Sequence, residues 1–225
     1  MFRKTTIRSY IFFISCCSLT CVFTLLSMYT HLSFRHCDFN YGWNRFDQGN
    51  LLASSFWGCI CFGLISGFII RYFGSKYPII LSHLWICYFA LYYSKMTTAY
   101  YEFWANEYFT SLSYGIIILG VIQLLITWIP LNELPYRIAM LLGCIGLGNI
   151  IGYGISWIGI VYFDRGLYCL YIIAILSFII SILWYSSKIT DSPFQNNKIS
   201  DNELAYLKSH PSIKTTSRLL CYLIE

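Results

Sequence analysis

Charged residues are scarce in this chain of 225 residues. Asp, Glu, Lys and Arg together make up 11% of it, whereas 57% is apolar and 20% is aromatic. An ordinary soluble domain carries about 25% charged residues, and a large water-soluble fold with so few would expose apolar surface and aggregate. The scarcity of charge therefore excludes a large soluble fold and indicates an integral membrane protein with the lipid bilayer as its main partner.

Several functional signatures are missing as well. Basic residues outnumber acidic ones by 15 to 10 but form no dense patch, which argues against a nucleic-acid partner. Most of the ten cysteines lie inside apolar runs, and no pair has CxxC spacing at a hydrophilic site, so neither a disulfide nor a metal site is assigned. We recognise no nucleophile–base set and no phosphate loop, which predicts that the protein is not an enzyme and holds no cofactor.

Long apolar runs dominate what is present. Each can cross about 30 Å of hydrocarbon as a helix, and the first is too long to be a cleaved signal peptide. The third is the weakest, because it contains His83 and many aromatic residues. The predicted fold class is an all-α, polytopic bundle of six transmembrane helices. The six runs are about 10–32, 50–70, 77–96, 107–129, 138–162 and 167–186.

The distribution of Lys and Arg predicts the orientation of this bundle. With the N-terminus inside, eleven of the fifteen basic residues fall in inner segments, as the positive-inside rule requires. Both termini are therefore expected in the cytosol, which agrees with an even number of crossings. The predicted organisation is a cytosolic N-terminus at 1–9, a transmembrane bundle at 10–186 and a cytosolic tail at 187–225.

Two apolar runs carry small residues at four-residue spacing. Cys59, Gly63 and Gly67 do so in the second run, and the fifth run has Cys144, Gly148, Gly152 and Ser156. Such stripes let helix backbones approach closely where lipid supplies no hydrophobic drive. We expect Gly63, Gly148 and Gly152 to lie at helix–helix contacts.

The tail contains a signal for one more short helix. Ser200 is a good N-cap, and Glu203 three residues later completes a predicted capping box. An amphipathic helix over about 201–209 should follow.

Four stretches resemble motifs of a known transporter family. The first, 48–58, contains Gln-Gly and then Ala-Ser-Ser-Phe-Trp-Gly, and the second, 66–76, is a glycine-containing basic loop. The third is Trp-Ile-Pro at 128–130 with Glu133, and the fourth is the segment after the sixth run. The loop motif is represented by Gly67, Arg71, Gly74 and Lys76, and the segment after the sixth run by Asp191, Pro193, Ser200 and Glu203.

With these motifs, residues of about 8–208 resemble the N-terminal half of a major facilitator superfamily transporter. The branch is that of the anion–cation symporters, solute carrier family seventeen, which includes sialin, the vesicular glutamate transporters and the sodium–phosphate cotransporters. The resemblance implies secondary active symport of an organic anion or inorganic phosphate by alternating access, with H⁺ or Na⁺ as the coupling ion. It also implies a lysosomal, vesicular or plasma membrane, and either a second copy or a C-terminal half of six helices as partner.

Charged positions depart from this family pattern. In the fourth run, Glu107 stands where the family usually has an Arg, and Tyr114 stands where it has a Glu before a Gly. Arg71 replaces an acidic residue that many superfamily members place in the inner loop. A buried anion needs a paired cation, and we find none in the middle of a predicted span except His83. Glu107 is the one candidate for proton coupling.

Other candidates for substrate or coupling roles have competing interpretations. Gln123 and Asn149 could line a pathway or hydrogen-bond between helices. His83 could titrate or simply pack, and Tyr114 could donate to a substrate or pack. Two functions remain open: a transporter of the family's type, and a transport-inactive half-length or truncated paralogue that acts by association with other membrane proteins.

Overall fold

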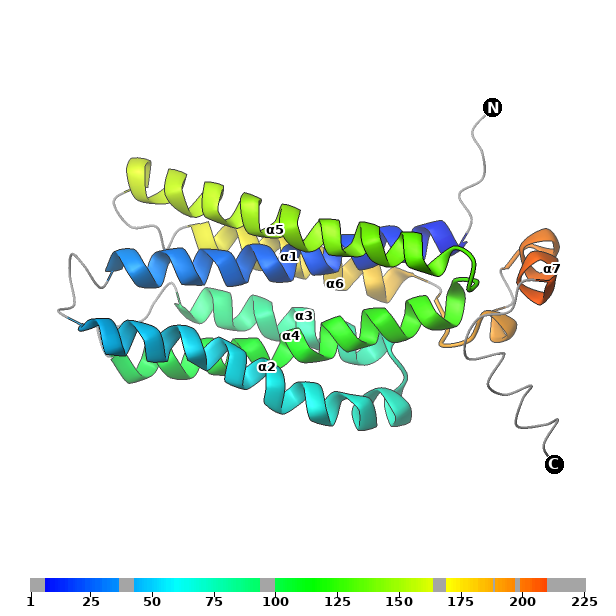
Figure 1. The fold of residues 1–225 in the computed structure, drawn as a ribbon, viewed down its shortest axis with the longest axis horizontal. Coiled ribbons are helices and arrows are strands. Elements are labelled where there is room, and N and C mark those ends of the chain that lie inside the picture. Colours follow the sequence, from blue (N-terminus) through cyan, green and yellow to red (C-terminus); the bar gives the residue numbers. More distant parts are fainter. Residues whose placement is uncertain are drawn as a thin grey trace.

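The computed structural model describes residues 7–36, 43–93, 100–163, 169–187, 189–196 and 199–209, and its regular elements there are all helical. Figure 1 shows that the long helices are roughly aligned and that a short helix lies across one end of them. The all-α bundle is confirmed. The helices are α1 (Ile7–His36), α2 (Arg45–Phe73), α3 (Lys76–Tyr93), α4 (Tyr100–Trp128), α5 (Leu134–Phe163), α6 (Cys169–Ser186) and α7 (Asp201–Ser209), with a 3-10 turn at Pro193–Gln195 before α7.

Five of these helices are long and apolar enough to cross a membrane: α1, α2, α4, α5 and α6. Helix α3 does not reach that hydropathy, which agrees with the expectation that the third run is the weakest. At 18 residues it is about 27 Å long, and it packs against α4 and α6. Its polar side chains Ser82 and His83 are buried in the bundle, whereas its aromatic residues Tyr77, Tyr88 and Tyr92 are exposed.

Several helices extend beyond the predicted apolar runs. Helix α2 begins at Arg45, five residues before the predicted start, because Asn44 caps it. The Asn44 side chain accepts the Asp47 amide at 2.9 Å, and the Asp47 carboxylate accepts the Asn44 amide at 3.2 Å. This capping box lies outside the apolar run, so hydropathy alone missed it.

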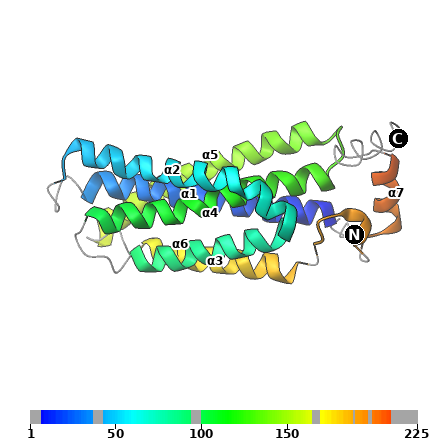
Figure 2. The same ribbon diagram turned by 90° about the horizontal axis from the view of Figure 1, so that it is seen from below.

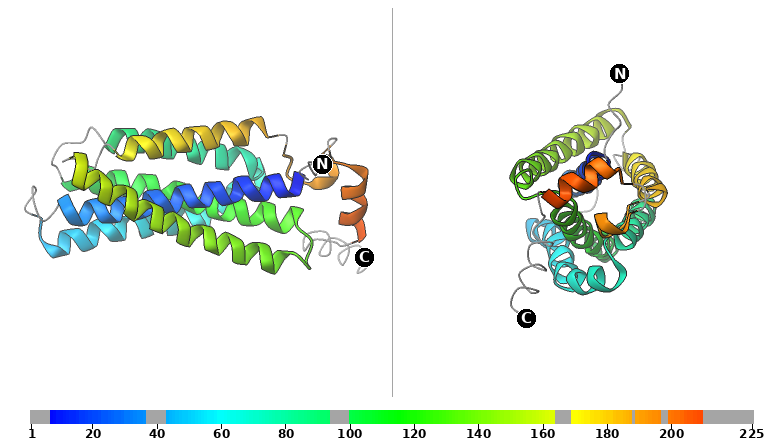
Figure 3. Two further views of the ribbon diagram at one scale, coloured as in Figure 1. Left: turned by 90° about the horizontal axis from the view of Figure 1, so that it is seen from above. Right: turned by 90° about the vertical axis from the view of Figure 1, so that its right-hand side faces the viewer.

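The six long helices pack as three pairs: α1 with α5, α2 with α4, and α3 with α6. Figures 2 and 3 show the pairs side by side from different directions. Helices α1 and α4 are mostly buried, whereas α2 and α5 are mostly exposed. The start of α1, the end of α6 and α7 lie at one end of the bundle, which we call the tail end (Figure 1).

Small residues set the close approach of α1 and α5. A Cβ on Gly148 would lie 2.6 Å from the Thr20 carbonyl oxygen, and one on Gly152 would overlap the Ser27 hydroxyl. Nearby, Thr20 donates its hydroxyl to the Cys144 carbonyl at 3.4 Å. The stripe on α5 therefore faces α1.

The pair α2 and α4 uses a different set of glycines. A Cβ on Gly115 of α4 would lie 2.7 Å from the Cys59 carbonyl oxygen and 2.8 Å from the Gly63 nitrogen. A Cβ on Gly63 itself, or on Gly67, would meet nothing within 4 Å. Gly63 therefore contributes its backbone to the contact, and Gly67 lies away from it.

Candidate functional site

A buried carboxyl group lies inside the bundle. Glu107 on α4 is only 1% exposed, so its side chain lies inside the bundle and not at its surface. Ser55 of α2 donates its hydroxyl to Glu107 Oε1 at 2.5 Å, and Oε2 has no hydrogen-bond partner. A carboxyl group in such an environment is costly when ionised and unpaired, and ionisable groups within membrane spans commonly mark ion or proton pathways.

Other buried polar groups surround this carboxyl. Tyr29 of α1 is fully buried, and its hydroxyl faces Thr110 and Asn106 of α4 without completing a hydrogen bond. Tyr114 is 3% exposed, its hydroxyl is unpaired, and it lies within electrostatic range of Tyr29 and Glu107. Unpaired buried polar groups are rare in native proteins, and several in one place suggest a site that exchanges a proton, an ion or a substrate group.

The remaining candidates do not join this cluster. His83 on α3 is fully buried, and neither ring nitrogen has a hydrogen-bond partner. Gln123 is half-buried nearer the tail end, where its main-chain carbonyl accepts the Thr127 hydroxyl at 2.8 Å. Asn149 is half-buried on α5. The described interactions thus relate Tyr114 to Glu107, and they relate none of the other three candidates to this pair.

Sequence reasoning missed Ser55, Asn106 and Tyr29. Ser55 is a polar residue inside the second apolar run, and Asn106 directly precedes the fourth run, so only Ser55 carried a signal in the sequence. Tyr29 gave no such signal, because a tyrosine near the end of a membrane helix is typical of interfacial anchoring. Its ring instead packs inside, 4.8 Å from the ring of Tyr93.

The loop motif and the segment after the sixth span meet at the tail end. Asp191 Oδ1 accepts the Ser75 amide at 2.8 Å, and Lys76 donates to the Ser187 carbonyl. Gly74 has a φ of +76°, and a Cβ there would overlap the Asp191 carboxylate. The two motifs therefore form one contact.

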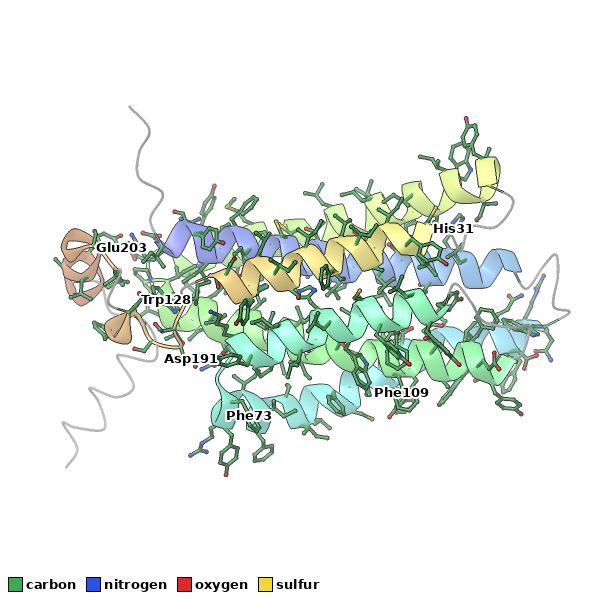
Figure 4. All side chains as sticks on the ribbon, turned by 180° about the vertical axis from the view of Figure 1, so that it is seen from behind. His31, Phe73, Phe109, Trp128, Asp191 and Glu203 are labelled. Atoms are coloured by element: carbon green, nitrogen blue, oxygen red, sulfur yellow. The ribbon has the colours of Figure 1, made fainter. Side chains whose placement is uncertain are left out.

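A second contact at the tail end joins α7 to the bundle. Arg8 Nε lies 3.1 Å from Glu203 Oε1, and its Nη1 lies 3.5 Å from Glu133 Oε1. Tyr206 donates its hydroxyl to Glu133 at 2.9 Å, and the Arg8 guanidinium lies 4.7 Å from the Tyr206 ring centroid. Figure 4 shows Glu203, Asp191 and Trp128 gathered at this end.

The predicted capping box at the start of α7 is only half formed. The Glu203 amide donates to Ser200 Oγ at 3.3 Å, as expected for an N-cap. The Glu203 carboxylate turns to Arg8 and does not return to the Ser200 amide. The ion pair between Glu203 and Arg8 thus takes the place of the expected hydrogen bond from the Ser200 amide to the Glu203 carboxylate. Pro193 opens the 3-10 turn before this helix, at a position where its missing amide is not needed.

Comparison with known proteins agrees with this architecture. The sequence profile of the Major Facilitator Superfamily matches residues 9–223. The chain is also similar to a protein of Oryza sativa subsp. japonica named "Probable anion transporter 3, chloroplastic", at 25% identity over 185 residues. The match covers 79% of this chain and 34% of that protein, so the chain spans about a third of the length of this relative.

The family is consistent with the six-helix bundle. Transporters need a polar pathway through the bilayer, and a helix bundle with buried polar groups can line one side of such a pathway. The chain belongs to the Major Facilitator Superfamily, a family of multi-pass membrane transporters and not of enzymes.

Proposed function

We propose that the chain is the N-terminal six-helix half of a proton-coupled anion transporter of the solute carrier family seventeen type. The substrate would be an organic anion or inorganic phosphate, moved by alternating access. The observation that carries this proposal is the burial of Glu107 with one hydroxyl donor and one free oxygen. The printed name of the rice relative, an anion transporter, supports the substrate class.

Glu107 is suited to carry a proton. Its carboxyl group is held between α2 and α4 by Ser55, while the free Oε2 can accept a proton without breaking that bond. Tyr114 and Tyr29 offer hydroxyls near it that can pass or stabilise the proton. A neutral and a charged Glu107 would place different electrostatic demands on these helices, and this difference can bias the bundle between two states.

The anion requires a cation that this half does not place in its interior. In the described spans, the Lys and Arg side chains lie at helix ends, such as Arg8, Arg45 and Arg71. A buried anion without a cation costs several kcal/mol. In this proposal the anion-binding cation comes from a second six-helix bundle that faces this one, and both termini of this half lie in the cytosol.

The same lack of an interior cation favours a second candidate function. In that alternative the chain does not transport and acts by association with other membrane proteins. Its exposed α2 and α5 helices would supply the contact surface. The two functions differ in whether any uptake depends on Glu107.

Uptake into proteoliposomes tests the proposal. We would measure labelled phosphate, glutamate and sialic acid, with and without an inward proton gradient, using the chain alone and with a six-helix C-terminal partner. Glu107→Gln should reduce gradient-driven uptake at least tenfold, whereas Glu102→Gln, in the first turn of the same helix, should leave it unchanged. Uptake driven equally well by the E107Q variant would exclude Glu107 as the proton carrier.

Other outcomes decide between the remaining ideas. Uptake that follows a Na⁺ gradient and ignores pH would replace the proton by Na⁺. No uptake above empty vesicles under any of these conditions would support the transport-inactive alternative.

A further inference from the structure

A cavity of about 810 Å³ lies at the tail end, away from the Glu107 cluster. It is bounded by the last turns of α2, the turn between α2 and α3, and the second half of α4. The proposed transport function does not use this cavity, and the following proposal is independent of whether the chain transports.

The lining of the cavity is amphipathic. Ile70, Leu119 and Ile122 form an apolar wall, while Gln123, Thr127 and Arg71 supply amide, hydroxyl and guanidinium groups. Purely apolar ligands would leave the guanidinium and the amide unpaired, and purely polar ligands would leave the apolar wall in water. The lining therefore suits a molecule with a polar head and an apolar body.

Of the charged side chains at the cavity, the Arg71 guanidinium is the one whose charge is not offset by a described neighbour. Asp191 also lines it, but its Oδ1 accepts the Ser75 amide at 2.8 Å. The Lys76 ammonium lies within electrostatic range of Asp191 and offsets its charge. Arg71 is exposed and forms no ion pair with any described residue. The excess charge at this site is thus positive and belongs to Arg71.

Exposed aromatic side chains indicate the depth of the cavity in the bilayer. Tyr72, Phe73 and Tyr77 flank Arg71 and are 81%, 69% and 63% exposed. Figure 4 shows Phe73 at the outer margin of the bundle near its tail end. Exposed aromatic residues at the ends of membrane helices anchor proteins at the headgroup level. The cavity therefore opens where phospholipid headgroups lie.

We propose that this cavity binds an anionic phospholipid, with the Arg71 guanidinium on its phosphate and the first acyl carbons along Ile70, Leu119 and Ile122. Guanidinium groups bind phosphate through two parallel hydrogen bonds, and basic pockets between membrane helices recognise anionic headgroups. Gln123 and Thr127 offer further polar contacts to the headgroup, and about 810 Å³ is within the usual size of a small-molecule site.

Binding of defined lipids to the purified chain tests the proposal. In a non-ionic detergent, short-chain phosphatidylglycerol would be titrated while bound lipid is counted by native mass spectrometry. Arg71→Gln should weaken phosphatidylglycerol binding about tenfold. Arg45→Gln, an exposed arginine at the other end of the same helix, should leave binding within twofold of the unchanged chain.

Three results would overturn the proposal. Equal binding of phosphatidylcholine and phosphatidylglycerol would show that the net negative charge of the lipid is not recognised. Unchanged binding in R71Q would show that the phosphate lies elsewhere. Displacement of phosphatidylglycerol by millimolar inorganic phosphate would identify a site for the free anion in place of a lipid.

A second variant covers the case in which R71Q does not fold. Leu119→Trp fills the apolar wall of the cavity while Arg71 is kept, and Leu119 is already 37% exposed, so the fold should tolerate it. This variant should also lower phosphatidylglycerol binding several-fold. Full binding in L119W would mean that the lipid does not enter the cavity.

Discussion

Gly74→Ala is the substitution for which the structure gives the sharpest expectation. Gly74 ends α2 with φ 76° and ψ 176°, a conformation essentially restricted to glycine. Holding alanine there costs about 1–3 kcal/mol. The new methyl would also lie 2.7 Å from Asp191 Cγ. Asp191 must then move and lose its bond from the Ser75 amide, which adds about 1.5–3 kcal/mol for a hydrogen bond to a charged group.

The total cost of Gly74→Ala is therefore about 2.5–6 kcal/mol of unfolding free energy. For a chain of this size, each kcal/mol shifts the unfolding midpoint by about 2–4 °C. The expected drop in Tm is about 5–24 °C, measured in detergent with a thiol-reactive dye that labels the buried cysteines as they become exposed. Protein concentration and scan rate must be kept constant, because unfolding of membrane proteins is commonly irreversible.

Gly67→Ala is the matched control for this experiment. Gly67 lies in the same helix, with open space around the position of its Cβ. Since alanine is a better helix former than glycine, G67A should be neutral or raise stability by up to about 1 kcal/mol. If G74A and G67A melt within a degree of each other, the reasoning about the turn is refuted.

A double-mutant cycle separates the two causes. In an Asp191→Ala background the carboxylate is gone, so Gly74→Ala should cost only the backbone strain of about 1–3 kcal/mol. An unchanged cost in that background would show that Asp191 does not limit the turn.

Two further predictions concern the contacts that hold the bundle together. Gly152→Val should lower Tm by several degrees, because the new side chain would overlap Thr24 and Ser27 of α1. Gly154→Val is the control and should change Tm little, because the space around its Cβ is open. Equal shifts in Tm for the two variants would contradict the α1–α5 contact. Glu203→Gln removes the charge that pairs with Arg8. It should raise the rate of amide hydrogen exchange in α7 about tenfold, which is equivalent to about 1.4 kcal/mol. An unchanged exchange rate would show that this ion pair does not hold α7 against the bundle.

The general architecture could be predicted from the sequence because it follows from local quantities. A run of about 20 apolar residues must form a helix in a bilayer, since every backbone polar group needs a partner there. The all-α bundle, the weakness of α3 and the helix at 201–209 all followed from such runs and from the Ser200 cap. The boundaries were less accurate, because caps such as Asn44 lie outside the apolar runs and extend a helix into polar sequence.

The candidate site could be predicted only in part. Glu107 was identified because a carboxyl group inside an apolar run is unusual. Its burial, and its hydrogen bond to Ser55 on α2, depend on how α2 packs against α4. Tyr29 could not be identified, because its sequence context is the same for a side chain at the interface and for one that packs inside.

The amino-acid sequence by itself determined that this protein spans the membrane several times with helices, because hydropathy and the positions of glycine, serine and charge act within single helices. Only the tertiary structure decided which polar groups meet. It placed Glu107 among unpaired hydroxyl and amide groups, joined Asp191 to the turn after α2, and turned Glu203 from its own helix cap to Arg8. These pairings join residues from 52 to 195 positions apart in the chain. Such contacts depend on the packing of whole helices, and the local pattern of neither partner encodes them.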